Sequence, residues 1–260
     1  MTYQMDHEAR KERERLRAIE AWVDPNTIGY LKTIGVGTGW NCLELGAGGG
    51  SIAEWLCRRV GETGHVVATD LQTKFIEEIN EPNLEVRKHD LRSDELEVSS
   101  FDLVHARALL EHLPEREQLM KKLVTTLKPG GWLLIESGDY LSLMAAEGDP
   151  DNLFDRAWPR FFDVLISNGM DPYYGRRLGA VLRENGLANV RLEGRVAEWG
   201  GSRPLTGIWL LMFQQFRNKV VDDGVLSAKD ADEFIDLLEK PSFCAITPTV
   251  YSGWGQKPKS

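Results

Sequence analysis

Residues 41–51 read NCLELGAGGGS, a short apolar run that ends in a cluster of glycines, and a helix-like segment follows at 51–60. Glycine has no Cβ, so such a turn lets the backbone reverse sharply and lets a ligand approach the chain closely. A helix that begins near Ser51 directs its free N–H groups toward whatever lies at the turn. The stretch is typical of a nucleotide-binding strand–turn–helix unit, and a plain tight turn is the simpler alternative.

Strand-like and helix-like segments alternate after this turn. The predicted strands of this region are 41–46, 65–70, 84–88, 101–106 and 131–137, and the predicted helices are 51–60, 73–80 and 114–127. Strands interleaved with helices of this length build right-handed crossovers and therefore a mainly parallel sheet.

The flanking regions are predicted to be mostly helical. We expect a helix at 6–22 and a second, short one that begins at Asp24-Pro25 and ends near Gly35, because an acidic N-cap followed by proline favours a helix start. Beyond residue 140 the predicted helices are 150–168, 175–185, 205–223 and 227–239, and the predicted strands are 188–198 and 245–256.

The overall composition is that of a globular protein with an acidic balance. The chain has 31 Lys+Arg and 40 Asp+Glu, a net charge of −9, which disfavours partners held mainly by phosphate neutralisation, such as nucleic acids. No run approaches the roughly 20 apolar residues that span a bilayer, and the first residues do not form a secretory signal. The three cysteines lie in apolar segments without metal-ligand spacing, so we expect buried thiols, no metal and a cytoplasmic protein.

The spacing of the glycines and of two later carboxylates narrows the ligand. A dinucleotide fingerprint G-x-G-x-x-G would need glycine where Ser51 stands, whereas Gly46, Gly48 and Gly50 form G-x-G-x-G. Asp70 ends the second predicted strand, where a carboxylate can accept both hydroxyls of a ribose. Asp90 follows the third strand, where it could accept from an adenine amino group.

Taken together, these features resemble the class I S-adenosylmethionine-dependent methyltransferases. The matching motifs occur in order at 44–50, 68–70, 89–91, 101–113 and 127–131. The resemblance implies an α/β fold: a three-layer Rossmann-like sheet of seven strands, mainly parallel with the last strand antiparallel, with the last two strands near 188–198 and 245–256. It implies one methyltransferase domain over 1–260, divided into N-terminal helices or a lid (1–40), a cofactor-binding core (41–140) and an acceptor-site cover with the final strands (141–260).

The resemblance also implies residue roles for S-adenosylmethionine. The glycine turn would wrap the methionine and ribose, Asp70 would hold the ribose diol, and Asp90 would accept from the adenine. Glu44 would support the turn or reach the ligand's amino group through water. The complete set of implied cofactor-binding residues is Glu44, Gly46, Ala47, Gly48, Gly50, Asp70, Leu71, Asp90, Leu91, His105 and Ala106.

Catalysis by the protein itself requires a base only if the acceptor must lose a proton before it attacks the methyl group. His105 and His112 are the candidate bases, with a structural role as the alternative for each. Arg107 is a candidate acceptor contact, or it pairs with Glu111 four residues later. The full set of candidate acceptor-binding residues is Arg107, Asp139, Tyr140, Trp158, Phe162, Trp209 and Phe213.

The acceptor class is narrowed by a missing motif and by local aromatic enrichment. Residues 105–108 read HARA, not the Asn/Asp-Pro-Pro-aromatic run of many amino-directed relatives, and 140–216 is rich in aromatic residues at helical spacing, including Trp158 and Trp209. An aromatic cover suits a flat, apolar molecule, although an ordinary helix core is the alternative. We therefore expect methyl transfer to a small aromatic or apolar metabolite, most simply on oxygen, as in secondary metabolism. The alternatives are an enzyme that carries out a non-methylating cyclisation or rearrangement in the same pocket, and a non-catalytic cofactor-binding protein. The oligomeric state, monomer or homodimer, is left open.

Overall fold

A seven-stranded sheet organises the computed structural model, which describes residues 9–203 and 205–259. The strand order is β3-β2-β1-β4-β5-β10-β7. The bounds are β1 (Asn41–Leu45), β2 (His65–Asp70), β3 (Leu84–Lys88), β4 (Phe101–Arg107), β5 (Leu127–Asp139), β7 (Ala188–Arg195) and β10 (Thr249–Gln256). Strands β1 to β5 pair in parallel, whereas β10 runs antiparallel to both β5 and β7. The predicted mainly parallel sheet with an antiparallel last strand is confirmed.

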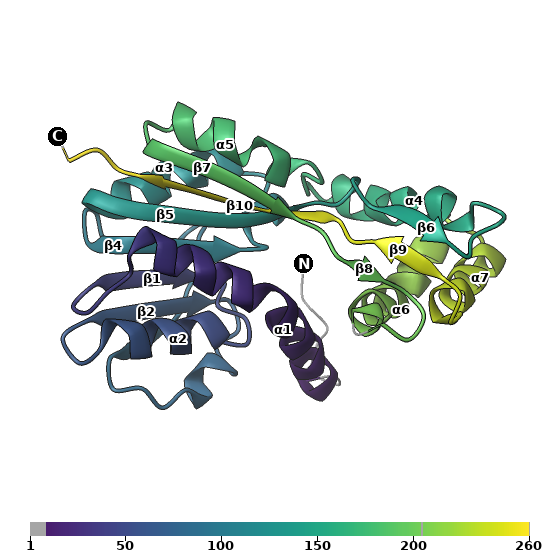
Figure 1. Cartoon of the computed structure of the whole chain (residues 1–260), viewed down its shortest axis with the longest axis horizontal. Helices are drawn as coiled ribbons and strands as arrows, with labels where there is room; N and C mark the ends of the chain where they lie inside the picture. Colours follow the sequence, from purple (N-terminus) through teal and green to yellow (C-terminus); the bar gives the residue numbers. More distant parts are fainter. Residues whose placement is uncertain (1–8, 204, 260) are drawn as a thin grey trace.

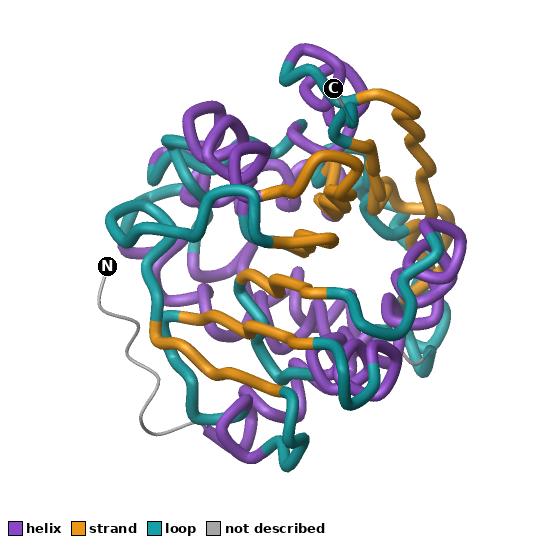
Figure 2. Tube along the Cα trace, turned by 90° about the vertical axis from the view of Figure 1, so that its left-hand side faces the viewer, coloured by secondary structure: helices purple, strands orange, loops and turns teal. Residues whose placement is uncertain are grey.

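Helices cover both faces of this sheet, which forms the central layer in Figure 2. One face packs against α1 (Ala9–Ile34) and α2 (Ser51–Val60), with Leu31 and Leu56 in its core. The other face packs against α3 (Arg116–Thr126) and α5 (Tyr174–Glu184). The helix predicted at 73–80 is reduced to the single 3₁₀ turn η1 (Ile76–Glu78), and a second such turn, η2 (Leu110–His112), follows β4.

The N-terminal region corrects the prediction of two separate helices. Helix α1 runs without a break through Pro25 and bends near its middle (Figure 1). Proline cannot donate the helical hydrogen bond, so an interior proline commonly bends a helix without ending it. Asp24 does not act as the expected cap but forms an ion pair with Arg107 at 2.9 Å. Residues 6–8 of the predicted first helix lie outside the described residues.

A second lobe lies beyond one end of the large sheet, on the right of Figure 1. It contains α4 (Leu153–Ser167), α6 (Thr206–Asp222), α7 (Ala228–Glu239) and a three-stranded sheet of β6 (Met144–Glu147), β9 (Cys244–Ile246) and β8 (Glu198–Trp199). The small sheet was not predicted. The strand expected at 245–256 is divided into β9 and β10, and Pro248, which lacks an N–H for the ladder, lies between them. That the whole chain is one domain stays a prediction.

Two general features of the sequence have structural counterparts. Cys42, Cys57 and Cys244 are free thiols in buried positions. Within the part of the chain that the structure describes, no helix combines the length and apolar character needed to cross a membrane.

Candidate cofactor and acceptor site

The glycine turn connects β1 to α2 at the carboxyl edge of the sheet. Gly46, Gly48 and Gly50 have φ values of +63°, +56° and +91°, in the left-handed region that other residues adopt only with strain. The turn is fastened to the neighbouring strand by the Ala47 N–H, which donates to the Thr69 carbonyl at 3.0 Å. The predicted glycine positions are therefore those at which the backbone conformation itself requires glycine.

Asp70 lies at the end of β2, directly beside this turn. Its Oδ2 accepts a hydrogen bond from the Gly48 N–H at 3.0 Å, and its Oδ1 accepts one from the Gln72 N–H at 2.9 Å. Both oxygens are thus held in place and retain further acceptor capacity. The neighbouring Leu71 side chain is 54% exposed, an apolar surface next to a fixed carboxylate. A ribose diol and a flat base fit this pair, so the donor and acceptor set matches the nucleoside part of S-adenosylmethionine.

Asp90 follows β3 and is already paired in the structure. Its two oxygens accept from Arg92 Nε and Nη2 at 2.9 and 2.6 Å, and the hydrogen bonds from Arg92 lower the pKa of Asp90 to about 2. The Asp90 carboxylate therefore stays ionised. An adenine amino group that bound to it would share its oxygens with Arg92. Leu91 is buried in the sheet core.

His105 forms a buried network with two glutamates instead of facing a ligand. Its Nδ1 lies 2.6 Å from Glu44 Oε2 and its Nε2 lies 3.2 Å from Glu136 Oε2, and all three side chains are buried. Burial alone would lower the pKa of His105, but the charge of Glu44 and the hydrogen bonds with both carboxylates raise it to about 9. His105 and Ala106 are both buried, and the geometry favours the structural alternative for His105, as an imidazolium between two carboxylates. Their predicted contacts with the cofactor stay predictions.

The same network reaches helix α1 through Thr27. The Thr27 hydroxyl donates to Glu136 Oε2 at 2.5 Å and accepts from Arg107 Nη1 at 3.0 Å. The other Glu136 oxygen accepts from the Ser252 hydroxyl at 2.5 Å. Arg107 thus pairs with Thr27 and Asp24 of α1, not with Glu111 as one alternative predicted.

Further toward its N-terminus, α1 passes over the glycine turn. A Cβ added at Gly48 would lie 3.5 Å from Leu16 Cδ2, and one at Gly49 would collide with the Glu20 carboxylate. Glu20 and Ser51 lie side by side in the wall of one cavity. The N–H and hydroxyl of Ser51 favour the charged form of Glu20, but its burial and the charge of Asp24 raise its pKa overall. Trp22, in the same stretch of α1, packs against the aromatic cluster of the second lobe. That the N-terminal segment acts as a lid stays a prediction.

The carboxyl ends of β4 and β5 bring together a different set of polar groups. Tyr140 follows β5, and its hydroxyl donates to Glu111 Oε1 at 3.2 Å. Glu111 is fully buried, and its Oε2 has no hydrogen-bond partner among the described residues. Asp139 is bound by Arg176 of α5 at 2.6 Å, whereas His112 is exposed. Sequence reasoning named Glu111 only as a possible partner of Arg107, and it missed Glu136 and Glu20. The available signal was a charged residue next to apolar ones.

The four predicted aromatic acceptor contacts lie inside the second lobe. Trp158, Phe162, Trp209 and Phe213 are all buried in one cluster, and the Trp158 and Trp209 ring centroids are 5.3 Å apart. Each ring is surrounded by others because α4 and α6 turn their apolar faces toward α7. These residues form the lobe's core, which favours the alternative of an ordinary helix core; their assignment to the acceptor-site wall stays a prediction.

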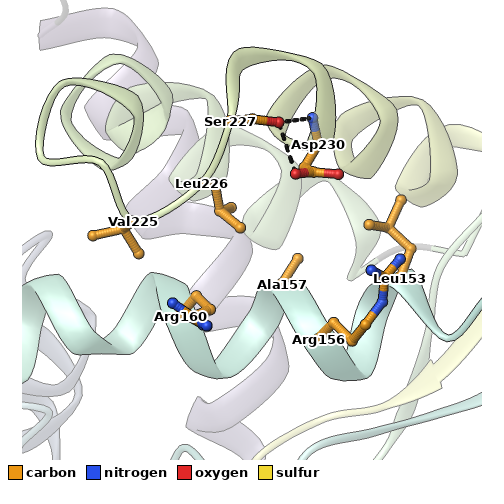
Figure 3. A pocket seen from close by; sticks show the side chains of 8 residues that line it. All are labelled: Leu153, Arg156, Ala157, Arg160, Val225, Leu226, Ser227 and Asp230. Atoms are coloured by element: carbon orange, nitrogen blue, oxygen red, sulfur yellow. Dashed lines mark hydrogen bonds between the residues drawn. The ribbon is translucent and has the colours of Figure 1, made fainter.

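Two surface cavities can be described from the residues that line them. One of about 480 Å³ lies between α1, the glycine turn and α2, and Leu16, Glu20 and Ser51 contribute to its wall. The other, of about 350 Å³, lies between α4 and the start of α7, with Arg156 and Arg160 at its rim (Figure 3). Its apolar floor includes Ala157, and none of its lining residues belongs to the glycine turn or the ends of β2 to β5.

The His105 network predicts a measurable titration. Because the folded pKa of about 9 exceeds the unfolded value of about 6.5, His105 contributes stability that is fully present below pH 6.5 and is lost as the pH rises through 9. Proton NMR of the imidazole should give a midpoint for His105 near pH 9, assigned by its absence in His105→Gln. A midpoint near 6.5 would contradict the ion-paired arrangement.

Comparison with known proteins agrees with this geometry. Residues 43–135 match the family model described as a methyltransferase domain. An uncharacterised 37.1 kDa protein in a Streptomyces fradiae transposon is 26% identical over 80% of this chain and 61% of its own length. Methyltransferase str2 of Strobilurus tenacellus is 29% identical over 57% of this chain and 53% of its own length. The chain thus spans somewhat more than half the length of these relatives.

Solved structures support the fold alone, because their identities are low. A Bacillus halodurans protein aligns with a TM-score of 0.59 at 17% identity, over 88% of this chain and 98% of that chain. Haemonchus contortus phosphoethanolamine N-methyltransferase 2, solved with S-adenosylhomocysteine, aligns with a TM-score of 0.56 at 16% identity, over 98% of this chain and 60% of that chain. The strand order, the glycine turn and the matched domain model agree, and they identify a methyltransferase domain of the class I S-adenosylmethionine-dependent type at residues 43–135.

Proposed function

We propose that this chain transfers a methyl group from S-adenosylmethionine to a small-molecule acceptor. The observation that carries the proposal is Asp70, which is fixed by the Gly48 and Gln72 N–H groups beside a turn of left-handed glycines. When bound, the cofactor supplies a methyl group already activated by its sulfonium. The protein therefore has to bind, orient and exclude water, and good positioning alone can contribute about 7–11 kcal/mol.

The residues that would hold the cofactor divide by position along the sheet edge. Asp70 would accept from the ribose hydroxyls, Leu71 would pack against the adenine, and Asp90 would accept from its amino group together with Arg92. The turn from Gly46 to Gly50 would surround the methionine part. Helix α1 would exclude water, since Leu16 and Glu20 already cover the turn.

For the acceptor, we propose a flat aromatic or apolar molecule that is methylated on oxygen. The ubiquinone biosynthesis O-methyltransferase of Paracidovorax citrulli is 28% identical over 44% of this chain and 50% of its own length, which supports oxygen. Other relatives are named C- and N-methyltransferases, so the acceptor atom is the part of the proposal most in need of a test. Tyr140, Asp139, Arg107 and the exposed His112 are the acceptor-side residues we retain, with His112 as the candidate base.

The direct test is an activity screen with methyl-labelled S-adenosylmethionine. The purified chain is incubated with panels of phenols, carboxylic acids and amines, and labelled products are separated and identified. Label on a phenol or hydroxyl oxygen supports the full proposal. Label on an amine or a carbon supports methyl transfer but overturns the proposal that oxygen is the acceptor atom. Cofactor binding with no labelled product in any panel would favour the non-methylating alternatives.

Asp70→Ala should weaken the binding of S-adenosylhomocysteine by about 100-fold or more, because two hydrogen bonds to a charged acceptor are lost. Isothermal titration calorimetry measures the change directly. The matched control is Asp223→Ala, which removes an exposed carboxylate at the end of α6 that pairs only with Lys219 among the described residues. Equal affinity in wild type and Asp70→Ala would remove Asp70 from the cofactor site.

A further inference from the structure

Helix α1 is attached to the carboxyl ends of β4 and β5 by a buried polar contact at Thr27. Thr27 is fully buried, and its hydroxyl donates to Glu136 Oε2 at 2.5 Å and accepts from Arg107 Nη1 at 3.0 Å. Arg107 also pairs with Asp24, one turn earlier in the same helix. Among the described residues, Thr27 is thus the point where α1, β4 and β5 share a hydrogen-bond network.

The same network continues to the strand that carries the glycine turn. Glu136 Oε2 also lies 3.2 Å from His105 Nε2, and His105 Nδ1 lies 2.6 Å from Glu44 Oε2. Glu44 is two residues before Gly46, and Glu44 and His105 are register partners in the β1–β4 ladder. A continuous chain of polar contacts therefore runs from α1 through β5 and β4 to the start of the turn.

Helix α1 also contacts the turn directly, about two to three helical turns away from Thr27. Leu16 lies against Gly48, and the Glu20 carboxylate lies against Gly49 and lines the same cavity as Ser51. Helix α1 runs without a break from Leu16 through its bend at Pro25 to Thr27, so one continuous element carries both the contact at Thr27 and the contacts over the turn.

We propose that Thr27 is a positioning residue for the cofactor: its hydrogen bond to Glu136 fixes α1 over the glycine turn, and through His105 the same bond fixes Glu44 beneath it. The inference rests on the proposed cofactor site and deepens it, because it assigns part of the cofactor affinity to a side chain that does not touch the cofactor. Hydrogen bonds to charged, buried groups are the strong class, so loss of this one should be measurable.

The test compares threonine-to-valine changes at two positions of the same helix. Thr27→Val keeps the side-chain shape and removes the donor to Glu136, and it should weaken S-adenosylhomocysteine binding roughly tenfold by calorimetry. Thr27→Ser keeps the hydroxyl and should restore affinity to within about twofold of wild type. Thr33→Val is the matched control, because the exposed Thr33 hydroxyl donates only to the Gly29 carbonyl within α1, at 2.9 Å.

Hydrogen exchange separates positioning from a general loss of stability. In Thr27→Val, amides around 16–20 of α1 should exchange faster, while amides of α3 should keep wild-type rates. Unchanged affinity in Thr27→Val would overturn the inference while leaving the proposed function intact, and so would equal losses in Thr27→Val and Thr33→Val. Failure of the wild-type chain to bind S-adenosylhomocysteine would overturn the proposed function and this inference with it.

Discussion

Replacing His105 by leucine should lower the free energy of unfolding by about 3–5 kcal/mol, the usual cost of removing one partner from a buried ionic network. Glu44 and Glu136 would then remain as buried carboxylates without their shared counter-charge. Burial would raise the pKa of Glu136, but its hydrogen bond from His105 and that residue's charge lower it overall, so the glutamate depends on the imidazolium. Urea unfolding followed by circular dichroism measures the loss.

A combined variant provides the control for this prediction. If His105→Leu is accompanied by Glu44→Gln and Glu136→Gln, no buried charge is left unpaired, and part of the lost stability should return. Recovery in the triple variant attributes the loss to the missing counter-charge. A His105→Leu protein with wild-type stability, or a triple variant less stable than the single one, would contradict the ion-paired description.

The sheet and the cofactor-binding edge were predictable because their signals are local. Alternating segments identified the strands, and the sharp turn expected at Gly46, Gly48 and Gly50 is made with left-handed conformations at all three. The burial of His105 was not predictable from its motif alone. It depends on the register of three strands. Glu44 lies opposite His105 in the β1–β4 ladder, and in the β4–β5 ladder Glu136 lies two residues beyond Leu134, the partner of His105. A titratable residue inside the apolar part of each of three strands, Glu44, His105 and Glu136, was the signal that such a network exists.

The N-terminal helix and the second lobe show where local rules were insufficient. Asp24-Pro25 has the ordinary chemistry of a helix start, but tertiary contacts bind Asp24 to Arg107 and Thr27 to Glu136, and α1 continues. The three strands of the small sheet, β6, β8 and β9, are two to four residues long, too short for a periodic pattern, and they pair between distant parts of the chain. Aromatic spacing along α4 identified an apolar face but could not tell a core from a binding wall.

Trp158→Ala should lower the free energy of unfolding by about 3–5 kcal/mol, because it empties a large volume in a packed interior. The centroid of the Trp158 ring lies 5.4 Å from that of Phe154 and 5.3 Å from that of Trp209, and 98% of the surface of Trp158 is buried. Tyr173→Ala is the control at a position that is 41% exposed, and it should change stability far less. Thermal and urea unfolding measure stability, and the affinity for S-adenosylhomocysteine measures the site. If Trp158 lined an acceptor pocket instead, Trp158→Ala would leave stability near wild type and raise the acceptor KM. A large loss of stability would support a core role for the aromatic cluster and leave acceptor recognition to the ends of β4 and β5.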